Sequence, residues 1–184
     1  MLNVLKTDLH KALQNKEISG LVDAFGLEVK NNKIIVDESK LRYGKIIITA
    51  DGDVDGSHIR VLFLTFIWKF CPELLEKGYI YAAVPPLYKA TIGTKIYYLK
   101  DDQALENFRK THLKFELNRH KGLGEMDPEE MAETVMSKES RTLKQISMED
   151  AEYVAKTFMN LMGESVTPRK KFIEDNAERA NIDV

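Results

Sequence analysis

Lys45-Ile-Ile-Ile-Thr-Ala-Asp-Gly-Asp-Val-Asp-Gly-Ser-His-Ile-Arg60 is the stretch that decides the fold. It opens with a continuous β-branched run, which is typical of a strand buried on both faces in a parallel sheet. An acidic loop follows, and Ser57 is suited to cap a helix that we expect to run to about Lys77. A second apolar run at 79–84 ends at two prolines. This order of strand, loop, helix and strand predicts an α/β core with the loop at the carboxyl edge of the sheet, where ligands usually bind.

The acidic loop predicts a metal site. Asp51, Asp53 and Asp55 alternate, so they project on one side if the loop is extended. Three carboxylates close together repel one another unless one is protonated or a cation neutralises them. Because all these ligands are oxygen atoms, we expect Mg²⁺, with Mn²⁺ or Ca²⁺ as alternatives, rather than zinc.

Two other patterns compete for this loop. An EF-hand calcium loop needs a glutamate at its twelfth position, which is Leu62 here, so that interpretation fails. A haloacid-dehalogenase-like phosphatase would use Asp51 as its nucleophile and needs a second acidic pair after another strand. The pair available, Asp101-Asp102, opens a predicted helix and gives this alternative poor support.

The elements on both sides of this core are also predicted. From about Leu5 to Phe25 the periodicity predicts a helix in two pieces, split near Asn15, and a polar hairpin follows at Asn31-Asn32. Further along, the expected elements are a hairpin at 87–99, a helix at 102–110, a strand at 113–117 and helices at 128–136, 148–162 and 168–180. The carboxyl-terminal part is therefore expected to be mostly helical.

Several motifs, in one order, resemble the B subunits of bacterial type IIA DNA topoisomerases, gyrase or topoisomerase IV. The acidic loop with its helix start resembles the Toprim signature of that family. The other resembling segments are Leu2-Asn-Val4, Leu41-Arg-Tyr43, Pro72-Glu-Leu-Leu-Glu-Lys-Gly78, Pro85-Pro-Leu-Tyr-Lys89, Arg119-His-Lys-Gly-Leu-Gly-Glu-Met126 and Pro168-Arg-Lys-Lys-Phe-Ile-Glu-Asp-Asn176. The likeness covers essentially the whole chain and implies a Toprim-like parallel sheet flanked by helices.

The resemblance also implies a mechanism. A tyrosine of the partner A subunit attacks a phosphodiester of double-stranded DNA, while Mg²⁺ on the Toprim carboxylates stabilises the developing charge. Carried over by position, Asp51 and Asp53 are metal ligands and Asp55 is a weaker third. The implied DNA contacts are Asn3, Arg60 and Lys121, with His58 either lining the site or capping the helix. No catalytic residue is assigned in this chain, and its seven tyrosines are expected to be packing residues.

The sequence also departs from the family pattern. The family's Toprim domain begins with a strand ending in Glu-Gly-Asp-Ser-Ala, whose glutamate binds metal, and neither this motif nor the ATPase region occurs in the 184 residues. We therefore expect 1–100 to be a partial Toprim domain and 101–184 its remainder with a helical tail. The chain would be a cut piece or one product of a split gene. ATP would act only through the missing ATPase half, a further partner, and the chain alone is expected to be inactive. A remaining alternative is a non-catalytic fragment that serves subunit assembly through its carboxyl-terminal helices.

Composition and charge indicate the class of protein and its cellular compartment. Hydrophobic residues make up 43% and charged residues 30%, which is typical of a globular protein, and no apolar run approaches the ~20 residues of a membrane span. The amino terminus lacks a signal-peptide pattern, which predicts a cytoplasmic protein without a membrane partner. Because the net charge is −2, DNA binding must depend on a local basic patch. The single cysteine, Cys71, is expected to be a buried apolar residue.

Overall fold

The computed structural model describes residues 1–51, 53–120, 122–148 and 151–179 and divides into two compact units. The first unit consists of Met1–Gly44, Val61–Tyr79 and Ser147–Val184, and the second of Lys45–Arg60 and Ile80–Ile146. The units therefore alternate along the chain. The division predicted from the sequence, a partial Toprim domain at 1–100 and its remainder at 101–184, stays a prediction.

The amino-terminal helices of the first unit have the predicted break. The elements are η1 (Val4–Lys6), α1 (Leu9–Leu13) and α2 (Lys16–Phe25). Asn15 separates α1 from α2, because its Oδ1 accepts hydrogen bonds from the backbone N–H groups of Glu17 and Ile18 and so caps α2. Gly26 ends α2 in the left-handed region, with a φ of 79°.

The predicted polar hairpin follows, with β1 (Glu28–Lys30) antiparallel to β2 (Lys33–Ile35). Asn31 and Asn32 both have positive φ, 51° and 57°, as a tight two-residue hairpin turn requires.

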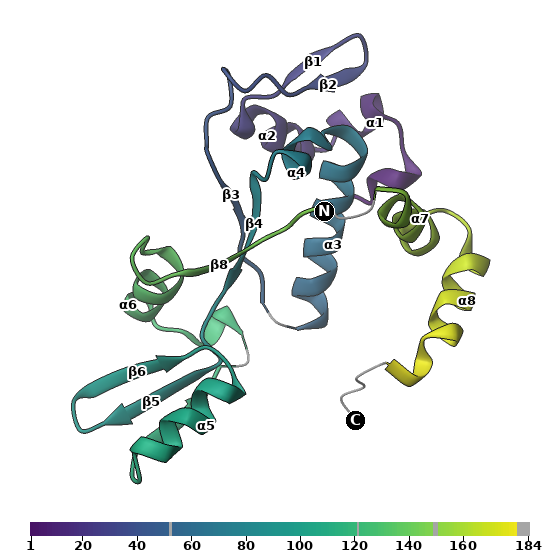
Figure 1. Ribbon diagram of the computed structural model, residues 1–184. Helices are drawn as coiled ribbons and strands as arrows, with labels where there is room; N and C mark the ends of the chain where they lie inside the picture. Colours follow the sequence, from purple (N-terminus) through teal and green to yellow (C-terminus); the bar gives the residue numbers. More distant parts are fainter. Residues whose placement is uncertain (52, 121, 149–150, 180–184) are drawn as a thin grey trace. The chain divides into compact units, whose positions relative to one another are not determined.

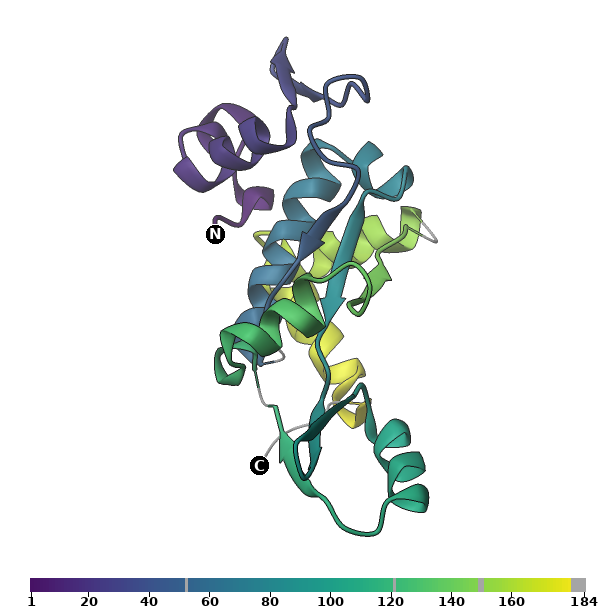
Figure 2. The same cartoon turned by 90° about the vertical axis from the view of Figure 1, so that its left-hand side faces the viewer.

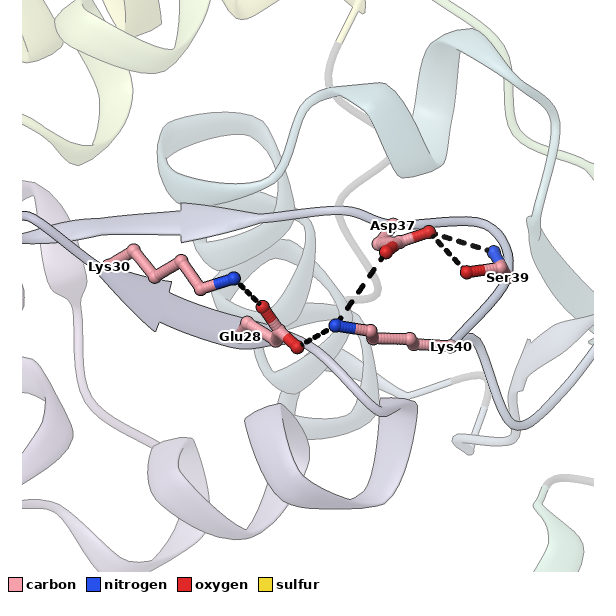
Figure 3. A network of polar contacts seen from close by, with 5 residues as sticks. All are labelled: Glu28, Lys30, Asp37, Ser39 and Lys40. Atoms are coloured by element: carbon pink, nitrogen blue, oxygen red, sulfur yellow. Dashed lines mark hydrogen bonds and ion pairs between the residues drawn. The ribbon is translucent and has the colours of Figure 1, made fainter.

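Ion pairs and hydrogen bonds hold the loop after this hairpin in place (Figure 3). The carboxylate of Glu28 pairs with the ammonium groups of Lys30 and Lys40, while Asp37 accepts hydrogen bonds from the backbone N–H and the hydroxyl of Ser39. All these groups are at least partly exposed, so the contacts define the path of the loop more than they stabilise the fold.

The long central helix differs from its prediction at both ends. It is α3 (Val54–Phe70), and a separate short helix, α4 (Glu73–Glu76), follows it. The predicted continuous helix from Ser57 to Lys77 is therefore wrong. Pro72 lies between the two helices, and a proline lacks the N–H needed to continue the hydrogen-bond ladder.

The core of the first unit contains the second half of α3. Leu62, Phe66 and Ile67 are almost fully buried, as is Cys71 just after the helix, in agreement with the expectation for the cysteine. Trp68 stacks on Phe158 of α7 (Ala151–Met162), with ring centroids 5.2 Å apart. The remaining elements of this unit are α8 (Val166–Asp175) and η4 (Ala177–Arg179). No helix in the described ranges is long and apolar enough to cross a membrane.

The first sheet of the second unit places β3 (Ile46–Ile48) beside β4 (Ile80–Val84), and Figures 1 and 2 both show the two strands side by side. They are parallel, with Ile46 opposite Ile80, as the strand–helix–strand order predicted. An antiparallel strand, β8 (Thr142–Gln145), pairs with the other edge of β4 and was not predicted. The three residues of β3 are half-buried, so the prediction of burial on both faces was wrong.

The second sheet has the strand order β6–β5–β7, with β5 (Tyr88–Ile92), β6 (Lys95–Leu99) and β7 (Glu116–Arg119) all antiparallel. The predicted hairpin turns at Gly93, whose φ is 60°. Helix α5 (Asp102–Thr111) lies along this hairpin (Figure 1) and contributes Leu105 to a core with Tyr88, Ala90 and Leu99. The chain then forms η2 (Leu123–Glu125), α6 (Pro128–Met131) and the π-helical segment η3 (Ala132–Met136).

Candidate metal and DNA site

The acidic loop lies between β3 and α3 in the second unit, and its middle carboxylate caps the helix. Oδ1 of Asp53 accepts a hydrogen bond of 2.7 Å from the backbone N–H of Gly56. The backbone carbonyl oxygen of Asp53 accepts another from the backbone N–H of Ser57. Asp53 therefore takes the capping position that was predicted for Ser57, because the helix begins four residues earlier than a helix capped by Ser57 would.

This early helix start changes the geometry of the three carboxylates. Asp55 lies inside the first turn of α3 and is exposed, so the loop is not extended here and the condition for three aspartates projecting on one side is not met. Among the described residues, no three histidine, cysteine, aspartate or glutamate side chains are grouped to hold a metal ion. Asp55 is placed where the helix dipole favours negative charge, and its role as a weaker third metal ligand stays a prediction.

The loop is compact because Gly56 meets the backbone of Asp51. A Cβ on Gly56 would lie 2.3 Å from the carbonyl oxygen of Asp51, which is closer than real Cβ atoms approach. Only glycine therefore allows the first helical turn and the end of the strand to come together here.

The second signature motif supplies a partner for Asp51. The backbone N–H of Leu123 donates a hydrogen bond of 2.6 Å to Oδ1 of Asp51, from 72 residues further along the chain. Beside it, Gly122 lies so near that an added Cβ would be 3.2 Å from Cγ of Asp51. Two motifs that are far apart in the sequence thus form one site, in which a backbone donor orients a carboxylate.

The arrangement fits a hard divalent cation with few protein ligands. Asp51 and Asp53 each use one carboxylate oxygen to accept a backbone N–H, and each carries a second oxygen. Mg²⁺ is commonly bound by one or two carboxylates together with water and substrate phosphate oxygens. The two aspartates therefore match the oxygen ligands that Mg²⁺ or Mn²⁺ prefers.

The predicted DNA contacts have different surroundings. His58 is exposed on the first turns of α3. Arg60 is half-buried, and its Nε is buried without a hydrogen-bond partner among the described residues, unlike an ordinary solvated arginine. Lys121 lies outside the described residues, and its role stays a prediction.

Asn3 belongs to the first unit, where its side chain is already engaged. Its Oδ1 accepts from the backbone N–H of Leu5, and its Nδ2 donates to the carbonyl oxygen of Met162 over 2.9 Å. These bonds link the amino-terminal segment to the end of α7. A phosphate contact by Asn3 would have to replace the hydrogen bond to Met162.

Sequence reasoning missed a buried polar group beside the second motif. Glu130 of α6 is only 4% exposed, and its carboxylate lies near the side chains of His120 and Lys89. Its neighbour Glu129 is exposed, as acidic residues in a first helical turn usually are. Nothing in the local sequence distinguishes the two glutamates, since the burial of Glu130 depends on segments distant in sequence.

The acidic pair required by the phosphatase alternative has other roles. Asp101 caps α5, because its Oδ1 accepts from the backbone N–H of Ala104, and Asp102 accepts from the hydroxyl of Tyr88. That hydrogen bond, with burial and the charge of Asp102, raises the pKa of Tyr88. The pair therefore serves the local fold of the hairpin and its helix.

Comparison with known proteins agrees with the two motifs. Residues 6–85 match the family described as Toprim domain, and residues 112–174 match DNA gyrase B subunit, carboxyl terminus. Similar curated proteins include the DNA gyrase B subunits of Thermus thermophilus, 44% identical, and of Mycoplasma pneumoniae and Staphylococcus aureus, each 46% identical. The similarity covers 100% of this chain but only 30%, 28% and 28% of those relatives.

Proposed function

Because this chain belongs to the B-subunit family of bacterial type IIA DNA topoisomerases, we propose that it is the Mg²⁺-dependent DNA-cleavage and religation part of such an enzyme. It would act on double-stranded DNA together with an A subunit that carries the nucleophilic tyrosine. ATP hydrolysis would belong to another part of the full-length protein, and the 184 residues alone would be inactive.

The observation that carries the proposal is the hydrogen bond from Leu123 to Asp51, which joins the two motifs in one site. A carboxylate held by a backbone donor is pre-oriented and loses little freedom when it binds a cation. Asp53 is held in the same way by Gly56. Both proposed ligands are therefore fixed by the fold before any metal binds.

The residues of this chain would contribute binding and orientation. When bound, Mg²⁺ would stabilise the negative charge that develops on the scissile phosphate and the leaving oxygen. Asp51 and Asp53 would hold it, with Asp55 as a weaker third ligand. Arg60 is a candidate phosphate contact because its buried, unpartnered Nε would gain an acceptor. Lys121, His58 and Asn3 are the other proposed DNA contacts.

Reconstitution tests this proposal. The chain is mixed with an A subunit, the missing ATPase half and a nicked duplex, and Mg²⁺-dependent covalent DNA–protein complexes are counted. We expect cleavage that is lost in Asp51→Asn, a change that keeps an oxygen to accept from Leu123. Asp23→Asn, at an exposed position of α2, is the matched control and should retain cleavage.

Two results would contradict the proposal. Absence of cleavage by the complete mixture would favour a purely assembly role for this chain. Hydrolysis of a simple phosphomonoester by the chain alone, abolished by Asp51→Asn, would instead restore the phosphatase alternative.

A further inference from the structure

A buried ionisable cluster includes His120, which lies two residues before Gly122 in the sequence. Oε2 of Glu130 is 3.4 Å from Nζ of Lys89, and Oε1 is 3.1 Å from Nε2 of His120. The side chains of Glu130, His120 and Lys89 are 4%, 9% and 20% exposed. Oε1 lacks a partner with hydrogen-bond geometry among the described residues, so its contact with His120 is a close polar approach rather than an aligned hydrogen bond. A buried carboxylate is costly unless a positive group such as the Lys89 ammonium accompanies it.

His120 is also fixed from the side opposite Glu130. Its Nδ1 lies 3.3 Å from the carbonyl oxygen of Pro86, and its backbone N–H donates to the carbonyl oxygen of Leu87 over 3.0 Å. The residue is thus held between the end of β4 and helix α6. Its position cannot change without the loss of contacts on both sides.

The position of His120 limits where Leu123 can lie. Three residues of chain reach at most about 10 Å, so an anchored His120 confines the N–H that orients Asp51. At the other end of this short link, Leu123 donates its N–H to the Asp51 carboxylate, and Gly122 lies so near that an added Cβ would be 3.2 Å from Cγ of Asp51. The described contacts therefore anchor both ends of this short link, His120 at Glu130 and Leu123 at the proposed metal ligand.

We propose that Glu130 is a positioning residue for the metal site: through His120 it limits where Leu123 lies, so that the Leu123 N–H keeps the Asp51 carboxylate in place. This inference rests on the proposed function, since it concerns the metal affinity of the same site. Glu130 contacts neither Asp51 nor Asp53 in the described structure, so its action on the metal is indirect.

The test uses the whole chain with Glu130→Gln, His120→Gln and the matched control Glu129→Gln, in which the neighbouring exposed glutamate loses its charge. Two quantities are measured: the NMR shift and hydrogen exchange of the Leu123 amide without metal, and Mn²⁺ affinity by calorimetry. We expect Glu130→Gln and His120→Gln to weaken Mn²⁺ binding by about 10-fold or more, the usual cost of losing an indirect support. The Leu123 amide should exchange faster in both. Glu129→Gln should change neither quantity.

The amide measurement separates this inference from the proposed function. Failure of the unsubstituted chain to bind Mn²⁺ would count against the metal site itself, and so against the function. A folded Glu130→Gln or His120→Gln chain with an unchanged Leu123 amide and unchanged Mn²⁺ affinity would overturn the positioning role, even if its melting temperature fell. If Glu130→Gln does not fold, His120→Gln gives the same test, because it keeps the buried carboxylate and its lysine partner.

Discussion

Gly122 approaches the Asp51 carboxylate so closely that an added Cβ would lie 3.2 Å from Cγ and 3.3 Å from Oδ1. Leu123, the next residue, donates its backbone N–H to the same carboxylate. A methyl group at position 122 would therefore press against this carboxylate, which would have to move by a few tenths of an ångström. Two residues further along, Gly124 has open space where a Cβ would stand, so the same turn provides its own control.

Replacement of Gly122 by alanine should damage the metal site without unfolding the chain. The new methyl group would push the Asp51 carboxylate away and lengthen its bond to Leu123. We expect Mn²⁺ affinity, measured by calorimetry, to fall by about 10-fold, while Gly124→Ala leaves it unchanged. Equal affinities for the two variants would show that the turn does not hold Asp51 in solution.

Gly26 should be essential for the stability of the first unit. Its φ of +79° disfavours any side chain, and a Cβ would lie 2.2 Å from the carbonyl oxygen of Lys40. Gly26→Ala should lower the free energy of unfolding by more than about 1 kcal/mol, from the left-handed backbone alone. The control is Gly20→Ala in the exposed middle of α2, where an added Cβ has no atom within 4 Å. Because alanine favours the helix more than glycine does, Gly20→Ala should raise the free energy of unfolding by about 0.5–1 kcal/mol. Urea unfolding curves measure both changes, and a neutral Gly26→Ala would contradict this packing.

Local patterns were sufficient to predict many elements and their ends. Asn15 and Asp101 cap helices with their own side chains, and Gly26 and Gly93 have the positive φ that their turns need. These features depend on residues within four positions of one another, so the sequence contains the whole interaction. The parallel pairing of β3 and β4 was predictable for a related reason, because the intervening helix allows it.

Interactions between distant residues were not predictable in the same way. Strand β8 exists because the edge of β4 is available to Thr142–Gln145, whose short sequence carries no alternation typical of a strand. The contact of Leu123 with Asp51 and the burial of Glu130 likewise depend on tertiary structure. At the acidic loop, the capping choice between Asp53 and Ser57 depended on where the helix began, and either residue is a favourable cap.

The Glu28 carboxylate should make the fold sensitive to acid. Hydrogen bonds from Lys30 and then Lys40 lower the pKa of Glu28 below its ordinary value. Because the pKa is lower in the folded chain, this contribution to stability is present above the unfolded pKa and is lost as pH falls through the folded pKa. Thermal melts at decreasing pH should show this loss in the wild type, and Glu28→Gln should reduce the slope. NMR titration of Glu28 at or above its ordinary pKa would contradict the paired geometry.

Cys71 should be unreactive in the folded protein. The residue is fully buried, and burial raises the pKa of its thiol far above the ordinary value, so almost no thiolate forms. A thiol reagent should label the native chain very slowly and the urea-unfolded chain rapidly, with one group per chain because there is one cysteine. Rapid labelling without denaturant would mean that the core around α3 opens readily.

DNA binding by the chain alone should be weak and sensitive to salt. With a net charge of −2, attraction to the duplex must come from a few local cations, and each neutralised phosphate adds to the salt dependence. Lys121→Ala should weaken binding to unrelated duplexes by a similar factor and reduce the log–log salt slope by about 1, because a phosphate contact carries no sequence information.

Lys114→Ala, at an exposed position outside the second motif, is the matched control and should change the slope less. Fluorescence anisotropy over a range of salt concentrations measures both. Tight binding that ignores salt, or an equal effect of the two substitutions, would show that the basic turn at 119–125 is not the DNA-contacting patch.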